Sequence, residues 1–199
     1  MAAPYWPATL KHGDITLRPM RGSDVRAWKE VRRRNAEWLK PWDATLPKEG
    51  VREGEIAPTF GSMVRRLRRE ARAGHTMPWA LLVQDRFAGQ VTVGGISWGS
   101  LRGAYIGYWI DQAVAGRGIM PTAVAMAMDF CFDVADLHRI EVNIRPENAA
   151  SIRVAEKLGL RLEGHRQAYL HIDGDWRDHV TYVLNRGEVP EGVLTRFLG

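Results

Sequence analysis

Residues 104–130 read AYIGYWIDQAVAGRGIMPTAVAMAMDF, with two glycines one residue apart, Gly116 and Gly118, in the middle of the stretch. The residues before the glycines have the pattern of a strand, and those from Pro121 to Ala135 repeat apolar side chains every three or four positions, as a helix does. Pro121 fits the first turn of that helix, where a backbone N–H is not needed. A glycine turn between a strand and a helix N-terminus suits a phosphate group, because free N–H groups and the helix dipole favour an anion. The same glycines can also serve the turn alone.

The residues around the glycines exclude two common nucleotide sites. A nicotinamide dinucleotide fingerprint needs a third glycine where this chain has Pro121, and it follows a parallel strand, whereas the strands expected here are antiparallel. A Walker loop needs a lysine and a serine or threonine directly after its last glycine, and none follows Gly118. The glycine turn can still bind a phosphate-bearing cofactor of another kind.

The rest of the chain predicts one α+β domain over residues 1–199, with tails at 1–12 and 187–199. Strand patterns occur at 14–18, 79–83, 90–96, 104–110, 139–144, 165–172 and 176–184. Helices are expected from about 25 to 31, 60 to 71, 121 to 135 and 148 to 158. Because a helix precedes 139–144, that strand is expected to run parallel to 104–110, which makes the sheet mixed. Residues 38–58, with three prolines and two glycines, predict a long irregular connection.

Composition limits the compartment and the partners. The single cysteine, Cys131, excludes an intramolecular disulfide, and its apolar neighbours indicate a core position. The chain shows neither a secretory leader nor a run of roughly 18 apolar residues, so we expect a soluble cytoplasmic protein without membrane contact. The net charge of +5 favours an acidic or phosphate-bearing partner. Arginine-rich runs at 32–34 and 65–69 carry much of this charge, and they are also typical of solvated helix faces.

No metal site is expected from the histidines. None of His138, His165, His171 and His179 pairs with another at the i, i+4 spacing of a helical metal site.

Several stretches together carry a resemblance to a known family. The window 113–118, AVAGRG, matches both glycine positions of the cofactor-loop pattern [QR]-x-x-G-x-[GA], with Ala113 at the position that is usually basic or an amide. Further matching stretches are ITLRPMRGSD (15–24), NAEWLKPWD (35–43), HRIEVNIRPENAASIRVAEKLGLRLEG (138–164) and YLHIDGDWRDHVTY (169–182). In these stretches the chain resembles the GNAT superfamily of acyl-CoA-dependent N-acetyltransferases, in particular the RimJ and RimL group that modifies ribosomal proteins at an N-terminal alanine.

The resemblance implies a GNAT-type fold, with helices on both faces of a central, mostly antiparallel sheet, and acetyl-CoA as cosubstrate. It implies that strands 104–110 and 139–144 splay apart and admit the pantetheine arm of acetyl-CoA. The main-chain contacts that it implies come from Trp109, Ile110, Gly116, Arg117, Gly118, Ile119 and Met120. It places Asn148 and Ser151 beside the thioester, although Asn148 is equally suited to cap the following helix.

The resemblance also implies direct attack of an amine on the thioester. In that scheme Glu163 accepts the amine proton and Ser151 or Tyr169 protonates the thiolate. The alternatives from the residues alone are that Glu163 is an ordinary surface side chain and that Tyr169 is a core residue. The aromatic segment with Trp38, Trp42 and Asp43 is expected to line the acceptor cleft.

Three functions fit these features. The first is acetylation of a protein N-terminus, such as that of a ribosomal protein, and the second is acetylation of a small-molecule amine. The third is a basic CoA-binding module that contacts RNA or the ribosome without catalysis. A monomer and a homodimer are both compatible with the sequence.

Overall fold

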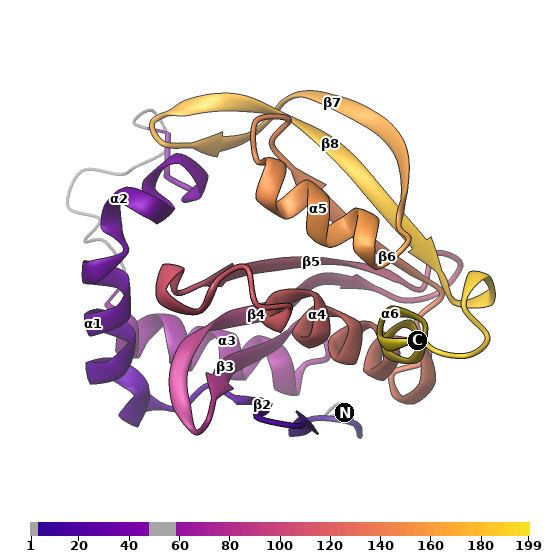
Figure 1. Ribbon diagram of the computed structural model, residues 1–199, viewed down its shortest axis with the longest axis horizontal. Helices are drawn as coiled ribbons and strands as arrows, with labels where there is room; N and C mark the ends of the chain where they lie inside the picture. Colours follow the sequence, from indigo (N-terminus) through magenta and orange to yellow (C-terminus); the bar gives the residue numbers. More distant parts are fainter. Residues whose placement is uncertain (1–3, 48–58) are drawn as a thin grey trace.

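The computed structural model describes residues 4–47 and 59–199, and its centre is one eight-stranded sheet with the order β1-β2-β3-β4-β5-β6-β8-β7 (Figure 1). The strands are β1 (Leu10–His12), β2 (Ile15–Pro19), β3 (Met77–Val83), β4 (Arg86–Ser97), β5 (Gly103–Ile110), β6 (Arg139–Ile144), β7 (Arg161–Ile172) and β8 (Asp175–Asn185). Strands β5 and β6 pair in parallel, and the other neighbours pair antiparallel. The predicted α+β class with a mixed, mostly antiparallel sheet is confirmed.

Helices cover both faces of the sheet (Figure 1). Helices α1 (Val25–Arg34) and α3 (Phe60–Arg72) lie on one face, and α4 (Ile119–Asp129), α5 (Ala149–Lys157) and α6 (Val193–Leu198) lie on the other. The shorter helical segments are α2 (Ala36–Leu39), η1 (Gly22–Asp24), η2 (Lys40–Trp42), η4 (Gln112–Val114), the π-helical η5 (Phe130–Val134) and η6 (Arg186–Glu188).

Strand β3 shows why the sheet needs cover on both sides. Its residues are almost all buried, and successive side chains of a strand point to opposite faces. Trp79 and Leu81 belong to the core under α4, while Ala80 and Leu82 belong to the core under α1 and α3. Helix α4 is correspondingly apolar all round, with every residue from 119 to 128 buried.

The elements differ from the sequence-based expectation in three places. The first part of the expected irregular connection 38–58 is helical, because residues 38–42 belong to α2 and η2. Residues 48–58 of this connection lie outside the described part of the chain. The predicted tails include β1 and α6. Helix α6 packs against α4 because the Asp129 carboxylate accepts hydrogen bonds from the N–H groups of Val193 and Leu194, at 2.6 and 3.0 Å. The predicted helix 121–135 begins two residues earlier and ends in the π-helical turn η5.

Among the helices of the described residues, none is long and apolar enough to cross a membrane.

Candidate functional site

The parallel pair β5–β6 opens along its length. Pairing is limited to three residues of each strand, from Gly103 with Arg139 to Tyr105 with Glu141. Beyond Tyr105 and Glu141, residues 106–110 of β5 and 142–144 of β6 diverge. The main-chain N–H and C=O groups on the facing edges of these segments are therefore not hydrogen-bonded to each other. Buried main-chain groups need hydrogen-bond partners, and an extended ligand between the strands would supply them.

The glycine loop lies at the open end of β5. Gly116 and Gly118 have φ values of 78° and 76°, in the left-handed region that glycine adopts without steric cost. A Cβ at either position would meet nothing within 4 Å, so the glycines are needed for the backbone conformation and not for packing. The loop therefore keeps open space in front of its backbone.

The N–H groups of this loop are available to an anion. Among the described residues, no group accepts a hydrogen bond from the main-chain nitrogen of Gly116, Arg117 or Gly118. Ile119 and Met120 begin α4, where the first N–H groups have no partner within a helix, while their side chains are anchored in the core. The sequence-predicted backbone contacts of 116–120 are thus together at one helix N-terminus.

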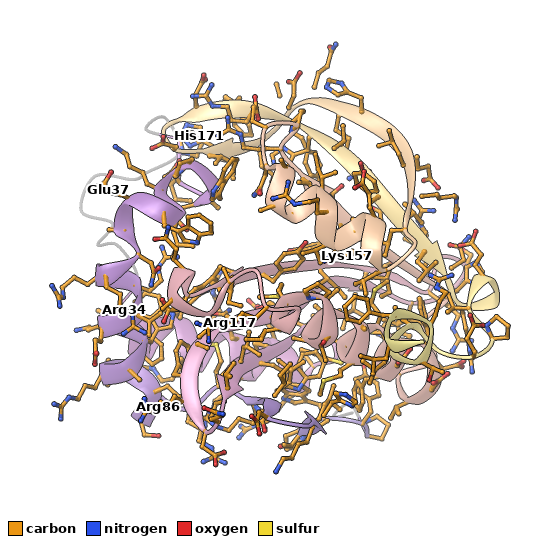
Figure 2. All side chains as sticks on the ribbon, viewed as in Figure 1. Arg34, Glu37, Arg86, Arg117, Lys157 and His171 are labelled. Atoms are coloured by element: carbon orange, nitrogen blue, oxygen red, sulfur yellow. The ribbon has the colours of Figure 1, made fainter. Side chains whose placement is uncertain are left out.

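The side chain of Arg117 adds positive charge beside the loop (Figure 2). It is exposed, and its guanidinium donates to the carbonyl of Ala113 at 3.1 Å. Ala113 occupies the position at which the loop pattern usually has a polar side chain, so Arg117 is the basic group that this loop offers.

A buried polar network that the sequence pattern does not predict fixes the start of the loop to α1. The buried Asp111 follows β5 directly and accepts from Asn35 at 2.8 Å and from the guanidinium of Arg34. The side-chain oxygen of Asn35 in turn accepts from the N–H of Gln112 at 2.9 Å. Burial raises the pKa of Asp111, but the hydrogen bonds from Arg34 and Asn35 outweigh this and hold it below its usual value.

Tyr108 and Ser151 meet on the α5 side of the open strands. The Tyr108 hydroxyl on β5 lies 2.7 Å from the Ser151 hydroxyl on α5. Burial raises the pKa of Tyr108 to about 12, although the hydrogen bond with Ser151 lowers it in part. Asn148 caps α5 by accepting from the N–H of Ser151 at 3.0 Å. The predicted pair Asn148 and Ser151 is therefore joined, and Tyr108 is a contact that the sequence analysis missed.

The predicted acceptor residues lie near the opposite face of the same strands. Asp43 forms a bidentate pair with Arg32, and the Arg32 guanidinium lies over the ring of Trp109, 5.3 Å from its centroid. The ring of Trp42 lies under Arg145 at 5.4 Å. Trp38 is half-buried on α2. The Asp43 carboxylate is thus already matched by a cation.

The segment after Asp43 is joined to the tip of the β7–β8 hairpin (Figure 2). The N–H of Thr45 donates to the carbonyl of His171 at 2.9 Å, and the N–H of Asp173 donates to the carbonyl of Asp43 at 3.1 Å. The Thr45 hydroxyl also lies 2.7 Å from His171 Nδ1. These contacts connect the N-terminal third of the chain to its C-terminal hairpin beside the open strands.

Glu163 lies on β7 in a chain of ion pairs. Its carboxylate accepts from both terminal nitrogens of Arg139 and from Arg161 at 3.2 Å, and the hydrogen bond from Arg139 is the main reason that its pKa is lowered. Arg139 also bonds Glu141 at 3.0 Å. The carboxylate is 40% exposed, and the described structure shows no hydrogen bond between it and the Tyr108–Ser151 pair.

Tyr169 lies at an irregularity of β7. The register of β7 against β8 shifts between Arg166 and Leu170, and such bulges often re-aim side chains beside active sites. The Arg166 guanidinium lies over the Tyr169 ring, 4.7 Å from its centroid, and the Tyr169 and His179 rings pack edge to face with their centroids 5.5 Å apart. Tyr169 and His179 thus form a pair on the terminal hairpin.

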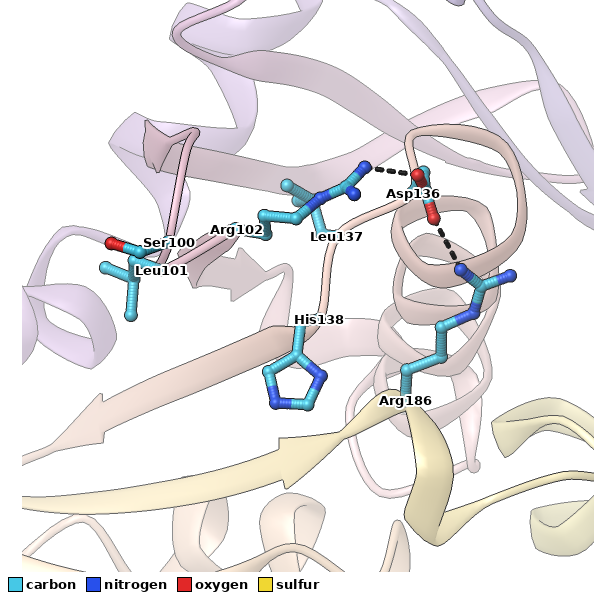
Figure 3. Close-up of a pocket in the computed structure, with 7 residues that line it drawn as sticks. All are labelled: Ser100, Leu101, Arg102, Asp136, Leu137, His138 and Arg186. Carbon is cyan, nitrogen blue, oxygen red and sulfur yellow. Dashed lines mark hydrogen bonds and ion pairs between the residues drawn. The ribbon is translucent and has the colours of Figure 1, made fainter.

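A separate surface pocket of about 300 Å³ lies at the closed end of the β5–β6 pair (Figure 3). Asp136 bridges Arg102 and Arg186 across it, so the charges that line it are largely matched. Its position at the end of β5 opposite the glycine loop separates it from the features above. As for metals, the residues that the structure describes contain no cluster of three or more His, Cys, Asp or Glu side chains able to hold an ion.

Comparison with known proteins gives these features a family context. Residues 14–161 match the model of the Acetyltransferase (GNAT) domain family. The chain is 43% identical over 102 residues to a probable N-acetyltransferase, YjcK, of Bacillus subtilis, a match that spans 51% of this chain and 56% of that protein. It is 30% identical over 165 residues to the [ribosomal protein uS5]-alanine N-acetyltransferase of Escherichia coli, across 81% of this chain and 83% of that protein.

A solved structure is similar over nearly the entire chain. Mycobacterium smegmatis RimJ in complex with CoA-disulfide superposes with a TM-score of 0.89 at 35% identity, covering 98% of this chain and 95% of that one.

Proposed function

The chain belongs to the GNAT family of acetyltransferases, and from this premise we propose that it moves an acetyl group from acetyl-CoA to the N-terminal α-amine of a protein, with a ribosomal protein as the favoured acceptor. The acceptor is suggested by the relative that acts on ribosomal protein uS5 and by the similarity to RimJ. Enzymatic acetyl transfer itself follows from membership of the family.

The observation that carries the proposal is the glycine loop at the open end of β5 and β6. Its N–H groups and the N-terminus of α4 are suited to the pyrophosphate of acetyl-CoA. The diverging strands offer Trp109 and Ile110 as main-chain partners for the pantetheine arm. A CoA-bound relative with a TM-score of 0.89 supports the same reading.

The acceptor chemistry favours an α-amine over a lysine. An α-amine with a pKa of about 7.8 is roughly a quarter neutral near pH 7.4, whereas a lysine with a pKa of about 10.4 is neutral about one part in a thousand. Direct attack needs the neutral amine, so an N-terminal α-amine can react with only a weak general base on the enzyme.

Four residues are proposed for the reacting end. Asn148 and Ser151 flank the thioester, and Ser151 or Tyr169 returns a proton to the departing thiolate. Glu163 is the candidate for the base, yet its ion pairs lower its pKa and so weaken it as a proton acceptor. A Glu163→Gln variant that keeps wild-type turnover from pH 6 to 9 would remove it from this role.

Trp38, Trp42 and Asp43 are proposed to line the acceptor side. Because Arg32 already neutralises Asp43, the carboxylate would orient Arg32 and shape the wall more than attract the cationic amine.

The test is release of free thiol from acetyl-CoA in the presence of three acceptors. The proposal predicts rapid release with peptides that begin with alanine or serine, and little with the same peptides blocked by N-terminal formylation. Release with spermidine or an amino sugar alone would favour the small-amine alternative. CoA binding without release, together with salt-sensitive RNA binding, would favour the non-catalytic alternative.

A further inference from the structure

We infer that His179, on β8, takes the proton from the acceptor amine through its Nε2 atom, in place of Glu163, whose ion pairs weaken it as a base. The inference rests on the proposed acetyl transfer and names a catalytic residue for it.

The register of the sheet places His179 beside the open end of β6. Its neighbour Val180 pairs with Ile144, the last residue of β6, and adjacent strands lie about 5 Å apart. The chain after Ile144 leads to Asn148 and Ser151, the residues proposed to flank the thioester. His179 therefore lies on the strand beside β6, next to the residue that pairs with the last residue of β6.

The His179 side chain points to the acceptor face of the sheet. It pairs with Arg166 on β7, and directly paired residues of antiparallel strands point to the same face. Arg166 bonds Glu141 at 2.8 Å, and Glu141 points away from the core that α5 covers, unlike its neighbours Ile140 and Val142. An amine that approaches from the side of Trp42 and Arg145 meets this face.

A hydrogen bond fixes the tautomer that a base requires. His179 Nδ1 lies 3.0 Å from the carbonyl oxygen of Arg177, which only accepts, so Nδ1 carries the proton and Nε2 keeps its lone pair. His179 is buried, with only 3% of its surface exposed. Among the described residues, no group is hydrogen-bonded to Nε2, and Nε2 is not one of the fully buried atoms without a partner, so it is the ring nitrogen that keeps slight access to solvent.

The surroundings keep the ring neutral. Burial lowers the pKa of His179 and nearby Arg145 lowers it further, while the hydrogen bond to Arg177 and the charges of Glu147 and Asp178 act in the opposite direction. The net effect lowers the pKa of His179 from its usual value, which favours the neutral imidazole. The Tyr169 ring packs edge to face with the imidazole, and the centroids of the two rings are 5.5 Å apart.

The proton balance of the step is complete. The amine nitrogen forms a bond to the thioester carbonyl carbon, the carbon–sulfur bond breaks, and the amine proton passes to Nε2. The thiolate takes a proton from Ser151 or Tyr169. The imidazolium then releases its proton to solvent, and the hydroxyl that protonated the thiolate regains one from solvent, so the enzyme returns to its starting state.

The experiment compares His179→Asn with the matched control His165→Asn on the same hairpin. His165 is half-exposed and pairs with Val180, so it points to the other face of the sheet. For the wild type, kcat with an alanine-initiated peptide should decrease in acid, as the His179 imidazole becomes protonated. The inference predicts that His179→Asn lowers kcat by about 100-fold or more and loses this acid limb, with unchanged CoA affinity. His165→Asn should retain wild-type kcat and its limb.

Chemical rescue distinguishes loss of the base from misfolding of the variant. Turnover of His179→Gly should recover with added imidazoles, and the recovery should increase with the pKa of the imidazole, which a group that merely fills a cavity would not show. Wild-type kcat and an intact acid limb in His179→Asn would overturn the inference and leave acetyl transfer standing. Failure of the wild type to acetylate any amine would overturn the inference together with the proposed function.

Discussion

Replacing Gly116 by alanine tests the glycine loop with the smallest possible change. The added methyl group meets nothing within 4 Å, so a steric clash with neighbours is not expected. The cost is conformational, because Gly116 has a φ of 78° and an L-residue pays roughly 1–2 kcal/mol in the left-handed region. The variant loop can escape this strain by leaving the conformation that presents its N–H groups.

Binding of CoA would then have to restore the strained conformation. A penalty of about 1–2 kcal/mol corresponds to a roughly 5- to 30-fold weaker Kd, since 1.4 kcal/mol is tenfold. The binding enthalpy and Kd can be measured by titration calorimetry with free CoA, so the result does not depend on knowing the acceptor.

Gly99 provides a matched control in the turn between β4 and β5. It has a φ of 71° and equally open surroundings, but it lies away from the loop. Gly99→Ala should lose comparable stability, with a Tm lower by roughly 2–8 °C, and keep the wild-type Kd. Equal Kd values for Gly116→Ala and the wild type would refute the reasoning.

Three further predictions concern the surroundings of the loop. Asn35→Ala removes a donor from the buried Asp111 carboxylate and should cost about 1–3 kcal/mol of unfolding free energy. Because the pKa of Asp111 is lowered in the folded state, the carboxylate stabilises the fold above its unfolded pKa of about 3.9, and this stabilisation is lost as the pH falls through the folded pKa. In urea unfolding, the difference in unfolding free energy between the wild type and Asn35→Ala should therefore become smaller in acid. Tyr108→Phe and Ser151→Ala should show a coupling of about 0.5–1.5 kcal/mol in a double-mutant cycle of thermal stability, and additive losses would contradict their hydrogen bond. Arg117→Ala should weaken CoA binding more at low salt than at high salt, and a salt-independent loss would exclude a charge effect.

The fold could be predicted where local pattern and topology agree. The position of Pro121 in the first turn of α4 follows from the local pattern, and the parallel pairing of β5 with β6 follows from the helix that joins the two strands. The glycine turn between a strand and a helix was also predicted, and the structure adds that Gly116 and Gly118 have left-handed φ values. Short-range chemistry was enough for these features.

Long-range contacts could not be predicted in this way. Asn35 and Asp111 are 76 residues apart, and the sequence around each of them does not show that they are in contact. The position of Asp111 directly after a strand hints at a functional carboxylate but does not identify its partner. His179 gave no helical spacing signal, because its surroundings depend on the register of β8 against β6 and on the irregularity of β7. Both cases arise from strand pairing, which a single sequence specifies weakly.

The most direct test of the account is to locate the acetyl group on a peptide that carries both kinds of amine. A peptide with an N-terminal alanine and an internal lysine is incubated with acetyl-CoA and the protein, and fragment masses identify the modified nitrogen. The account predicts acetylation at the α-amine of the alanine, abolished by prior blocking of that amine. Acetylation confined to the lysine, or none on any peptide of a panel with varied N-termini, would contradict it.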